Sequence, residues 1–207
     1  NTQEKIAGIN RSMQSYLENG IFHCYPGSFI YVERTLLNGD IRKGIVAAVD
    51  LEQYDYSPAS ASSVRATEKT VTERIPPRVE IRKDAPIELP HVLLLCDDAQ
   101  LQLIESVCCK KQQLPLLYDL ELMEGGGHIK GRLVQGEHLV CFTEKMEAYG
   151  DFIVHKYQDS KKIPMMFAVG DGNHSLATAK ACYEDVKLKN PGQDLSNHPA
   201  RYALVEV

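Results

Sequence analysis

The sequence predicts an α+β protein with a mixed, largely antiparallel sheet and helices packed on it. Three observations predict this class: a hairpin signal early in the chain, strand–helix alternation late in it, and an ordinary globular composition. The chain has 207 residues, 43% of them hydrophobic and 25% charged, which is enough for a sizeable core. We therefore expect one α+β domain over 1–207, or a fragment of a longer protein. Both ends look truncated, because the chain begins inside a helical pattern and ends in a strand pattern.

The first half predicts a helix, a hairpin and a charged segment. Apolar residues recur at helical spacing over 2–19, which favours a helix. Two β-rich runs over 28–52 are joined by Asn38-Gly39, one of the strongest short hairpin signals. Composition favours a loop over 54–63, and the helical potential of 64–90 is expected to stop at its Pro-Pro pair.

The second half predicts alternating strands and helices. We expect a buried strand over 91–98, an amphipathic helix and then a strand over 99–122, and a glycine-bounded hairpin over 125–134. A helix follows within 136–163. The C-terminal part predicts a strand over 163–169, an exposed turn over 170–174, a helix over 175–188 and a closing strand.

Charge and cysteine content exclude some classes of protein. The formal net charge is -5, which argues against nucleic acid as the main partner, since such domains usually carry a basic excess. No apolar run approaches the ~20 residues of a membrane span. Six cysteines are present without a CxxC pair, which favours reduced thiols in a cytoplasmic protein.

The segment 167–185, FAVGDGNHSLATAKACYED, concentrates polar groups where a strand gives way to a helix. Glycines at 170 and 172 allow positive φ and close backbone approach. A helix that begins near Ser175 presents free N–H groups and a positive dipole end, which suits a phosphate. Asp171 could then hold a metal or accept a proton, and His174 could donate to a phosphate oxygen or transfer a proton.

A purely structural explanation of this segment is also open. Asn173 or Ser175 would cap the helix, Asp171 would form an Asx turn, and His174 would be merely exposed. Each residue alone favours that explanation. Their concentration at the end of an apolar strand favours a functional site.

A second candidate set, made of charged residues, lies at 65–82, well before the segment 167–185. Its basic members surround Glu68 and Glu73, and they are Arg65, Lys69, Arg74, Arg78 and Arg82. The arginine fork binds two phosphate oxygens at once, and Glu68 could serve as a general base or a metal ligand. A solvated helix face with i,i+3 and i,i+4 ion pairs explains the same pattern about equally well.

The segment 167–185 resembles the Asp-Gly-His-His-Arg segment of a bacterial family known as domain of unknown function 1015. Residues 64–82, 88–98 and 125–131 resemble that family's middle region, so the resemblance covers most of the chain. The motif is in turn similar to the phosphate-binding box of the ParB/sulfiredoxin-like superfamily, which includes nucleotide-hydrolysing partition proteins, sulfiredoxin and free-serine kinases. The resemblance implies a ParB/sulfiredoxin-like core.

Position by position, the motif's Asp, Gly and second His correspond to Asp171, Gly172 and His174. Asn173 stands where the first His would be, and Ser175 stands where the Arg, the usual phosphate clamp, would be. Phosphate binding would then depend on Ser175 and the helix N-terminus, with the missing charge supplied from outside the motif by Arg65, Arg74 or Arg78. The resemblance also makes Glu68 a candidate for the acid that activates a hydroxyl nucleophile.

These inferences predict a protein that binds a nucleotide or phosphate and that could be a small-molecule kinase or a nucleotide hydrolase. The catalytic candidates are Glu68, Asp171 and His174; the phosphate-binding candidates are Gly172, Asn173, Ser175, Arg65, Arg74 and Arg78. Mg²⁺ on Asp171, a nucleotide (ATP, ADP or CTP) and a small hydroxylated metabolite would be the partners, with no nucleic acid and no membrane. Two alternatives remain: a non-catalytic nucleotide- or metabolite-sensing module, and a structural interaction domain.

Overall fold

One twisted mixed sheet organises the computed structural model, which describes residues 1–58, 60–158 and 163–207. Nine strands of the described residues lie in the order β3-β4-β8-β5-β9-β2-β1-β7-β6. Most neighbouring strands are antiparallel, whereas β3–β4, β4–β8 and β5–β9 are parallel. The expected α+β class is therefore confirmed.

The strands are mostly short. They are β1 (Phe29–Thr35), β2 (Ile41–Asp50), β3 (Tyr54–Asp55), β4 (Val64–Ala66), β5 (Leu93–Cys96), β6 (Leu116–Glu121), β7 (His128–Val134), β8 (Phe167–Asp171) and β9 (Tyr202–Glu206). The α-helices are α1 (Thr2–Glu18), α2 (Ile75–Arg82), α3 (Ile104–Cys108), α4 (Glu137–Lys156) and α5 (Asn173–Lys189).

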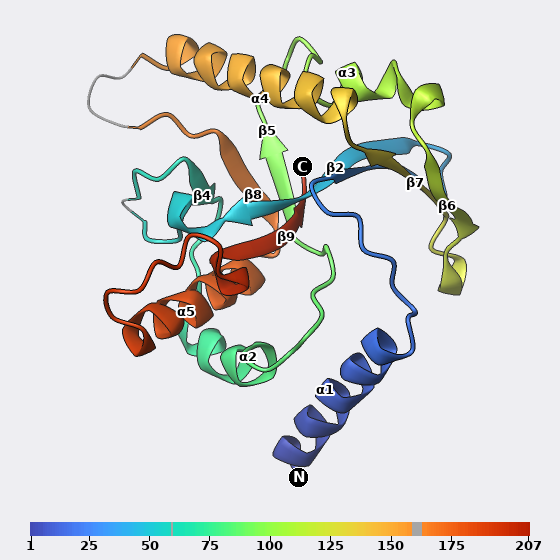
Figure 1. Cartoon of the computed structure of the whole chain (residues 1–207). Coiled ribbons are helices and arrows are strands. Elements are labelled where there is room, and N and C mark those ends of the chain that lie inside the picture. The colour runs from blue at the N-terminus through green and yellow to red at the C-terminus, as the bar shows by residue number, and fades with distance from the viewer. Residues whose placement is uncertain (59, 159–162) are drawn as a thin grey trace.

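Helices cover both faces of the sheet, with α5 and α2 on one side and α4 and α3 on the other (Figure 1). Each side has its own hydrophobic cluster. The first packs Leu176, Ala179 and Tyr183 of α5 on strands β3, β4, β5, β8 and β9. The second packs α3 and α4 on β1, β2 and β7. Strands β4, β8 and β5 have a second face, turned away from α5. This face lies next to the cluster formed by α3 and α4.

Several expected elements are confirmed. The helix over 2–19 is α1, the hairpin is β1–β2, and the glycine-bounded hairpin is β6–β7. The closing strand, β9, pairs within the chain with β2 on one side and β5 on the other. In the described part of the chain, no helix is both long enough and apolar enough to cross a membrane. All six cysteines are free thiols.

In the middle of the chain, two expectations are wrong: the helix stop at Pro76-Pro77 and the full burial of the strand at 91–98. The expected helix and then strand over 99–122 are confirmed as α3 and β6, although the helix is short. Pro76 and Pro77 open α2 instead of stopping a helix, because first-turn residues need no intrahelical N–H bond. The helix within 99–122 is only the five residues of α3: Leu101 has a left-handed φ of 54°, and the Asp98 carboxylate accepts from Leu103 N at 2.6 Å, so the chain turns first. The strand at 91–98 is only half-buried, since Leu95 is 57% exposed.

The element boundaries within the segment 167–185 also differ from the expectation. The strand begins at Phe167 instead of residue 163, and the helix begins at Asn173 instead of residue 175. The turn therefore shrinks to a single residue, Gly172.

Candidate functional site

The junction of β8 and α5 requires glycine at position 172. Gly172 has a φ of 89°, and a Cβ built there would lie 3.0 Å from both Cα and Cγ2 of Val92. A larger residue would meet left-handed strain and a steric contact together. Gly170 has no positive φ; a Cβ there would lie 2.8 Å from Leu95 Cγ. The sequence allowed positive φ and close approach at both glycines. Gly172 has both features, and Gly170 has the close approach alone.

The first turn of α5 has no side-chain cap. Gly172 occupies the N-cap position, and the first backbone bond of the turn runs from Leu176 N to Gly172 O at 3.0 Å. Within the described residues, the N–H groups of positions 173–175 have no protein acceptor. The capped-helix explanation is therefore wrong in this respect, because neither Asn173 nor Ser175 is the cap. Three unpaired donors at the positive end of a helix attract an anion.

A loop after β4, residues 67–71, lies against this helix start. Strands β4 and β8 are parallel, with Ala66 opposite Val169. The segments that follow the two strands therefore leave the sheet at the same end. Thr67 Oγ1 donates to Val169 O at 2.6 Å, and Val71 N donates to His174 Nε2 at 3.1 Å. The 67–71 loop is thus fastened at both ends to the β8–α5 junction, and it carries Glu68 between the two fasteners.

The bond from Val71 decides the proton position on His174. Nε2 accepts a hydrogen bond, so this nitrogen carries no proton in the structure, and a neutral ring then has its N–H at Nδ1. The Nδ1–H is free to donate to a ligand.

Two buried polar side chains at this junction lack partners. Asn173 is 3% exposed and Thr70 is 6% exposed, and neither Asn173 Oδ1 nor Thr70 Oγ1 has a hydrogen-bond partner among the described residues. Buried polar groups are normally paired with protein or ordered water. Each of these two groups could therefore take a water molecule or another polar partner.

Asp171 lies exposed at the end of β8. Its Oδ1 accepts from Gly172 N at 2.7 Å, which leaves Oδ2 available. Within residues 1–58, 60–158 and 163–207, no group of three or more His, Cys, Asp or Glu side chains could hold a metal. Asp171 could therefore supply only one protein ligand to a cation.

The three arginines expected as clamps do not lie together. Arg74 and Arg78 are exposed at the start of α2, where Arg78 Nη1 donates to Arg74 O at 2.9 Å; α2 packs against α5. Arg65 points to the other face of the sheet, because its neighbour Val64 is in the α5 cluster. Its guanidinium donates to Ser62 O at 2.7 Å and to Ile163 O. Arg65 is thus separated from the helix N-terminus by the sheet.

Sequence reasoning did not select Thr67 and Thr70, the threonines on either side of Glu68, as site residues. Thr67 and Thr70 were overshadowed by the charged residues between and around them. The signal that could have found them is the pair of hydroxyls that follows a short β-rich run, VRA, directly before a loop.

The fold and this junction define an α+β protein in which a helix without a side-chain cap begins at the C-terminal end of β8. A comparison with protein families matches the whole of residues 1–207, and the chain belongs to the family described as "Protein of unknown function (DUF1015)". Comparisons with curated proteins and with solved structures found no significant match.

Proposed function

We propose that the β8–α5 junction binds a phosphate group of a nucleotide or phosphorylated metabolite. The observation that carries the proposal is the open first turn of α5, where Asn173, His174 and Ser175 present unpaired N–H groups beside a glycine cap. Helix N-termini of this kind bind phosphate through N–H donors and the helix dipole together. The similarity of segment 167–185 to a phosphate-binding box supports the same ligand.

The side chains around the turn suit an anion. His174 offers its Nδ1–H because Val71 N occupies Nε2. Thr70 has a buried hydroxyl without a partner, and the Ser175 hydroxyl lies on the same first turn. Donors that are already fixed in place lose little entropy when a ligand arrives.

A Mg²⁺ ion fits this site as a companion of the nucleotide. Mg²⁺ is usually bound through one or two carboxylates together with substrate phosphates, and Asp171 has one free carboxylate oxygen at the end of β8. The ion would neutralise phosphate charge, while Asp171 would orient the phosphates relative to α5.

Phosphoryl transfer to a small hydroxylated metabolite is the activity that this arrangement supports best. Glu68 is exposed on the 67–71 loop, where its carboxylate could take the proton of the acceptor hydroxyl. The hydroxyl oxygen would form a bond to the terminal phosphorus as the bond to the nucleoside diphosphate breaks. Positioning and charge neutralisation account for most of the catalysis of such reactions.

A non-catalytic nucleotide sensor is the second candidate. It is favoured by one observation: Ser175 replaces the motif arginine, and Arg65, one possible substitute, lies on the other face of the sheet. Of the three arginines expected as clamps, Arg74 and Arg78 then remain, on the helix α2 that packs against α5. Release of nucleoside diphosphate over time distinguishes the enzyme from the sensor.

Calorimetric titration with ATP, ADP, CTP and inorganic phosphate, each with and without Mg²⁺, tests the proposal. His174→Ala removes one donor to a charged ligand, worth about 1.5–3 kcal/mol, so affinity should fall about tenfold or more. His23→Ala changes an exposed histidine outside the junction and should leave the affinity unchanged.

Asp171→Asn separates the roles of metal and phosphate. It should weaken binding of the Mg²⁺–nucleotide complex while leaving metal-free phosphate binding intact. Asp151→Asn, at an exposed position of α4, is the control. The proposal is refuted if none of the four compounds binds, or if His174→Ala binds them as tightly as the unchanged protein.

A further inference from the structure

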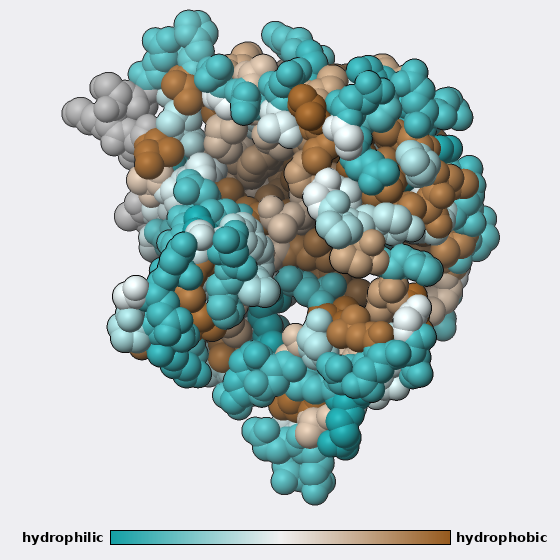
Figure 2. Space-filling model, viewed as in Figure 1, coloured by the Kyte–Doolittle hydropathy of each residue, from teal (hydrophilic) through white to brown (hydrophobic). Residues whose placement is uncertain are grey.

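A hollow lies on the face of β4, β8 and β5 that is turned away from α5. Val169 is buried in the α5 cluster, and its neighbour Ala168 lines the hollow, because successive strand side chains point to opposite faces. The cavity has a volume of about 420 Å³. Figure 2 shows a brown recess where Figure 1 places β5 and β8.

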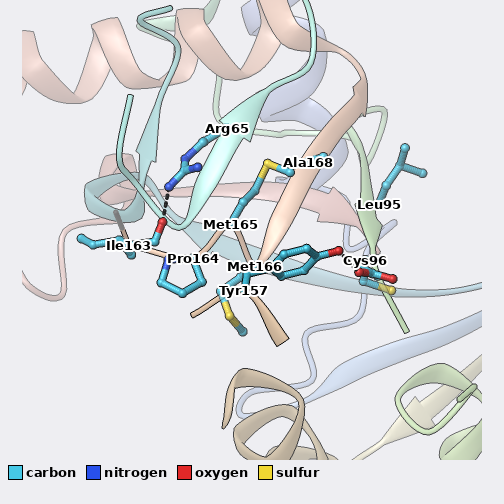
Figure 3. A pocket seen from close by; sticks show the side chains of 10 residues that line it. Arg65, Leu95, Cys96, Tyr157, Ile163, Pro164, Met165, Met166 and Ala168 are labelled. Atoms are coloured by element: carbon cyan, nitrogen blue, oxygen red, sulfur yellow. Dashed lines mark hydrogen bonds between the residues drawn. The ribbon is translucent and has the colours of Figure 1, made fainter. Parts of the chain in front are cut away.

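The side chains that line this hollow are mostly apolar, and several of them are exposed to solvent. Figure 3 shows Leu95, Ala168, Met165 and Ile163 around it. Leu95 is 57% exposed and Ile163 is 59% exposed, so apolar surface from two distant parts of the chain meets water at one place. The volume lies within the roughly 300–1,000 Å³ typical of small-molecule sites, which are lined by apolar side chains with few polar groups.

Among the described residues that line the hollow, Arg65 is the one with a positive charge, and it has no carboxylate partner. Its guanidinium is held by two neutral carbonyl oxygens. Nε donates to Ser62 O at 2.7 Å, and Nη2 donates to Ile163 O, the bond drawn in Figure 3. No Asp or Glu of the described residues lies within ion-pair distance of it. Nε and Nη2 are used, so Nη1 retains donors for a ligand.

The other charge in the lining is already neutralised. Asp97 Oδ2 accepts from Lys156 Nζ at 2.6 Å and from the Tyr157 hydroxyl. These bonds lower the pKa of the Asp97 carboxyl. Arg65 therefore decides which charge a ligand should bring.

We propose that this hollow binds a compact, mostly apolar carboxylic acid, with its carboxylate on Arg65 and its apolar body on Leu95, Ala168 and Met165. An apolar ligand covers the exposed surface, and the planar guanidinium fork suits a carboxylate. This site is separate from the proposed phosphate site, since the sheet lies between the Arg65 guanidinium and α5.

Calorimetric titration of the whole chain with octanoate tests the proposal, with 1-octanol as the uncharged comparison. Octanoate should bind at least tenfold more tightly than octanol, because only the acid pairs with Arg65. Ala168→Leu fills the floor of the hollow without removing the charge of Arg65 and should weaken octanoate binding at least tenfold. Ala99→Leu, on an exposed loop, is the matched control and should change nothing.

Arg65→Gln tests the carboxylate separately. Gln keeps N–H donors for the two carbonyls and removes the charge, so octanoate should lose its advantage over octanol. If this variant fails to fold, the octanoate-to-octanol ratio of the unchanged protein decides the point. The proposal is overturned if octanoate does not bind, if Ala168→Leu binds it normally, or if octanol binds as tightly as octanoate.

Discussion

Replacing Gly172 by alanine tests the geometry on which the phosphate site depends. Gly172 combines a φ of 89° with a close approach to Val92, whose Cα and Cγ2 would each lie 3.0 Å from the new Cβ. Gly192 supplies a matched control: its φ is 76°, and nothing lies within 4 Å of a Cβ built there. The two substitutions share the left-handed strain and differ in the steric contact.

The magnitudes follow from these two terms. Left-handed strain costs about 1–2 kcal/mol, and the lower entropy of the unfolded alanine chain returns about 0.4–1 kcal/mol. Gly192→Ala should therefore destabilise the fold by about 1 kcal/mol. Gly172→Ala adds an overpacking cost of about 1–3 kcal/mol, which makes it the more harmful substitution by that amount.

Urea denaturation of both variants measures the difference, with the slope of each transition checked for constancy. A Val92→Ala background removes Cγ2 but not Cα, so the extra cost of Gly172→Ala should shrink there without vanishing. Equal destabilisation by Gly172→Ala and Gly192→Ala would refute the reasoning. It would mean that the β8–α5 junction relaxes freely and does not hold the helix start in place.

Two further predictions concern the stability of the fold, through the side-chain hydrogen bonds of Asp50 and Tyr149. Asp50 accepts from Arg201 Nε at 2.9 Å and Nη2 at 2.7 Å, and these bonds hold the pKa of Asp50 below its ordinary value of 3.8. A lowered folded-state pKa contributes stability that is present above pH 3.8 and is lost as the pH falls through the folded value. Urea denaturation should therefore show Asp50→Asn less stable at pH 7, with a gap to the unchanged protein that narrows below pH 3.8; a constant gap would contradict this. Tyr149 OH donates to Met166 O at 2.7 Å and accepts from Asp97 N at 3.0 Å, so Tyr149→Phe leaves two groups unpaired and should cost about 1–3 kcal/mol. Tyr16→Phe on exposed α1 should cost almost nothing, and equal stability of the two variants would exclude the bridging role.

The fold class was predictable because its signals are local. Asn38-Gly39 fixes a hairpin by turn geometry alone, and the helical spacing of α1 is a property of its own residues. The predictions of individual elements failed where the local propensity of a residue depends on its position in the element. Pro76 and Pro77 disrupt a helix interior but fit a first turn, and only the chain before them decides which position they occupy.

The candidate site was predictable in composition but not in arrangement. Asp171, Gly172 and His174 lie within four consecutive positions, so their proximity needs no tertiary information. The contact between Val71 and His174 depends on the parallel pairing of β4 with β8, which no local pattern encodes. The same pairing sends the Arg65 guanidinium to the opposite face, because alternation along β4 is fixed once Val64 enters the core.

Strand β8 explains why the two proposed sites can be tested independently. Its Val169 side chain anchors the sheet to α5, and its C-terminal end delivers Asp171 and Gly172 to the helix start. Ala168, on the opposite face, forms the floor of the hollow. A substitution at Ala168 therefore enlarges a side chain away from α5, whereas a substitution at His174 changes a donor away from the hollow. Ala168→Leu should leave phosphate affinity unchanged, and His174→Ala should leave octanoate affinity unchanged. If either variant lost both ligands, the two faces of β8 would be coupled through the strand itself, and the separation of the sites by the sheet would be wrong.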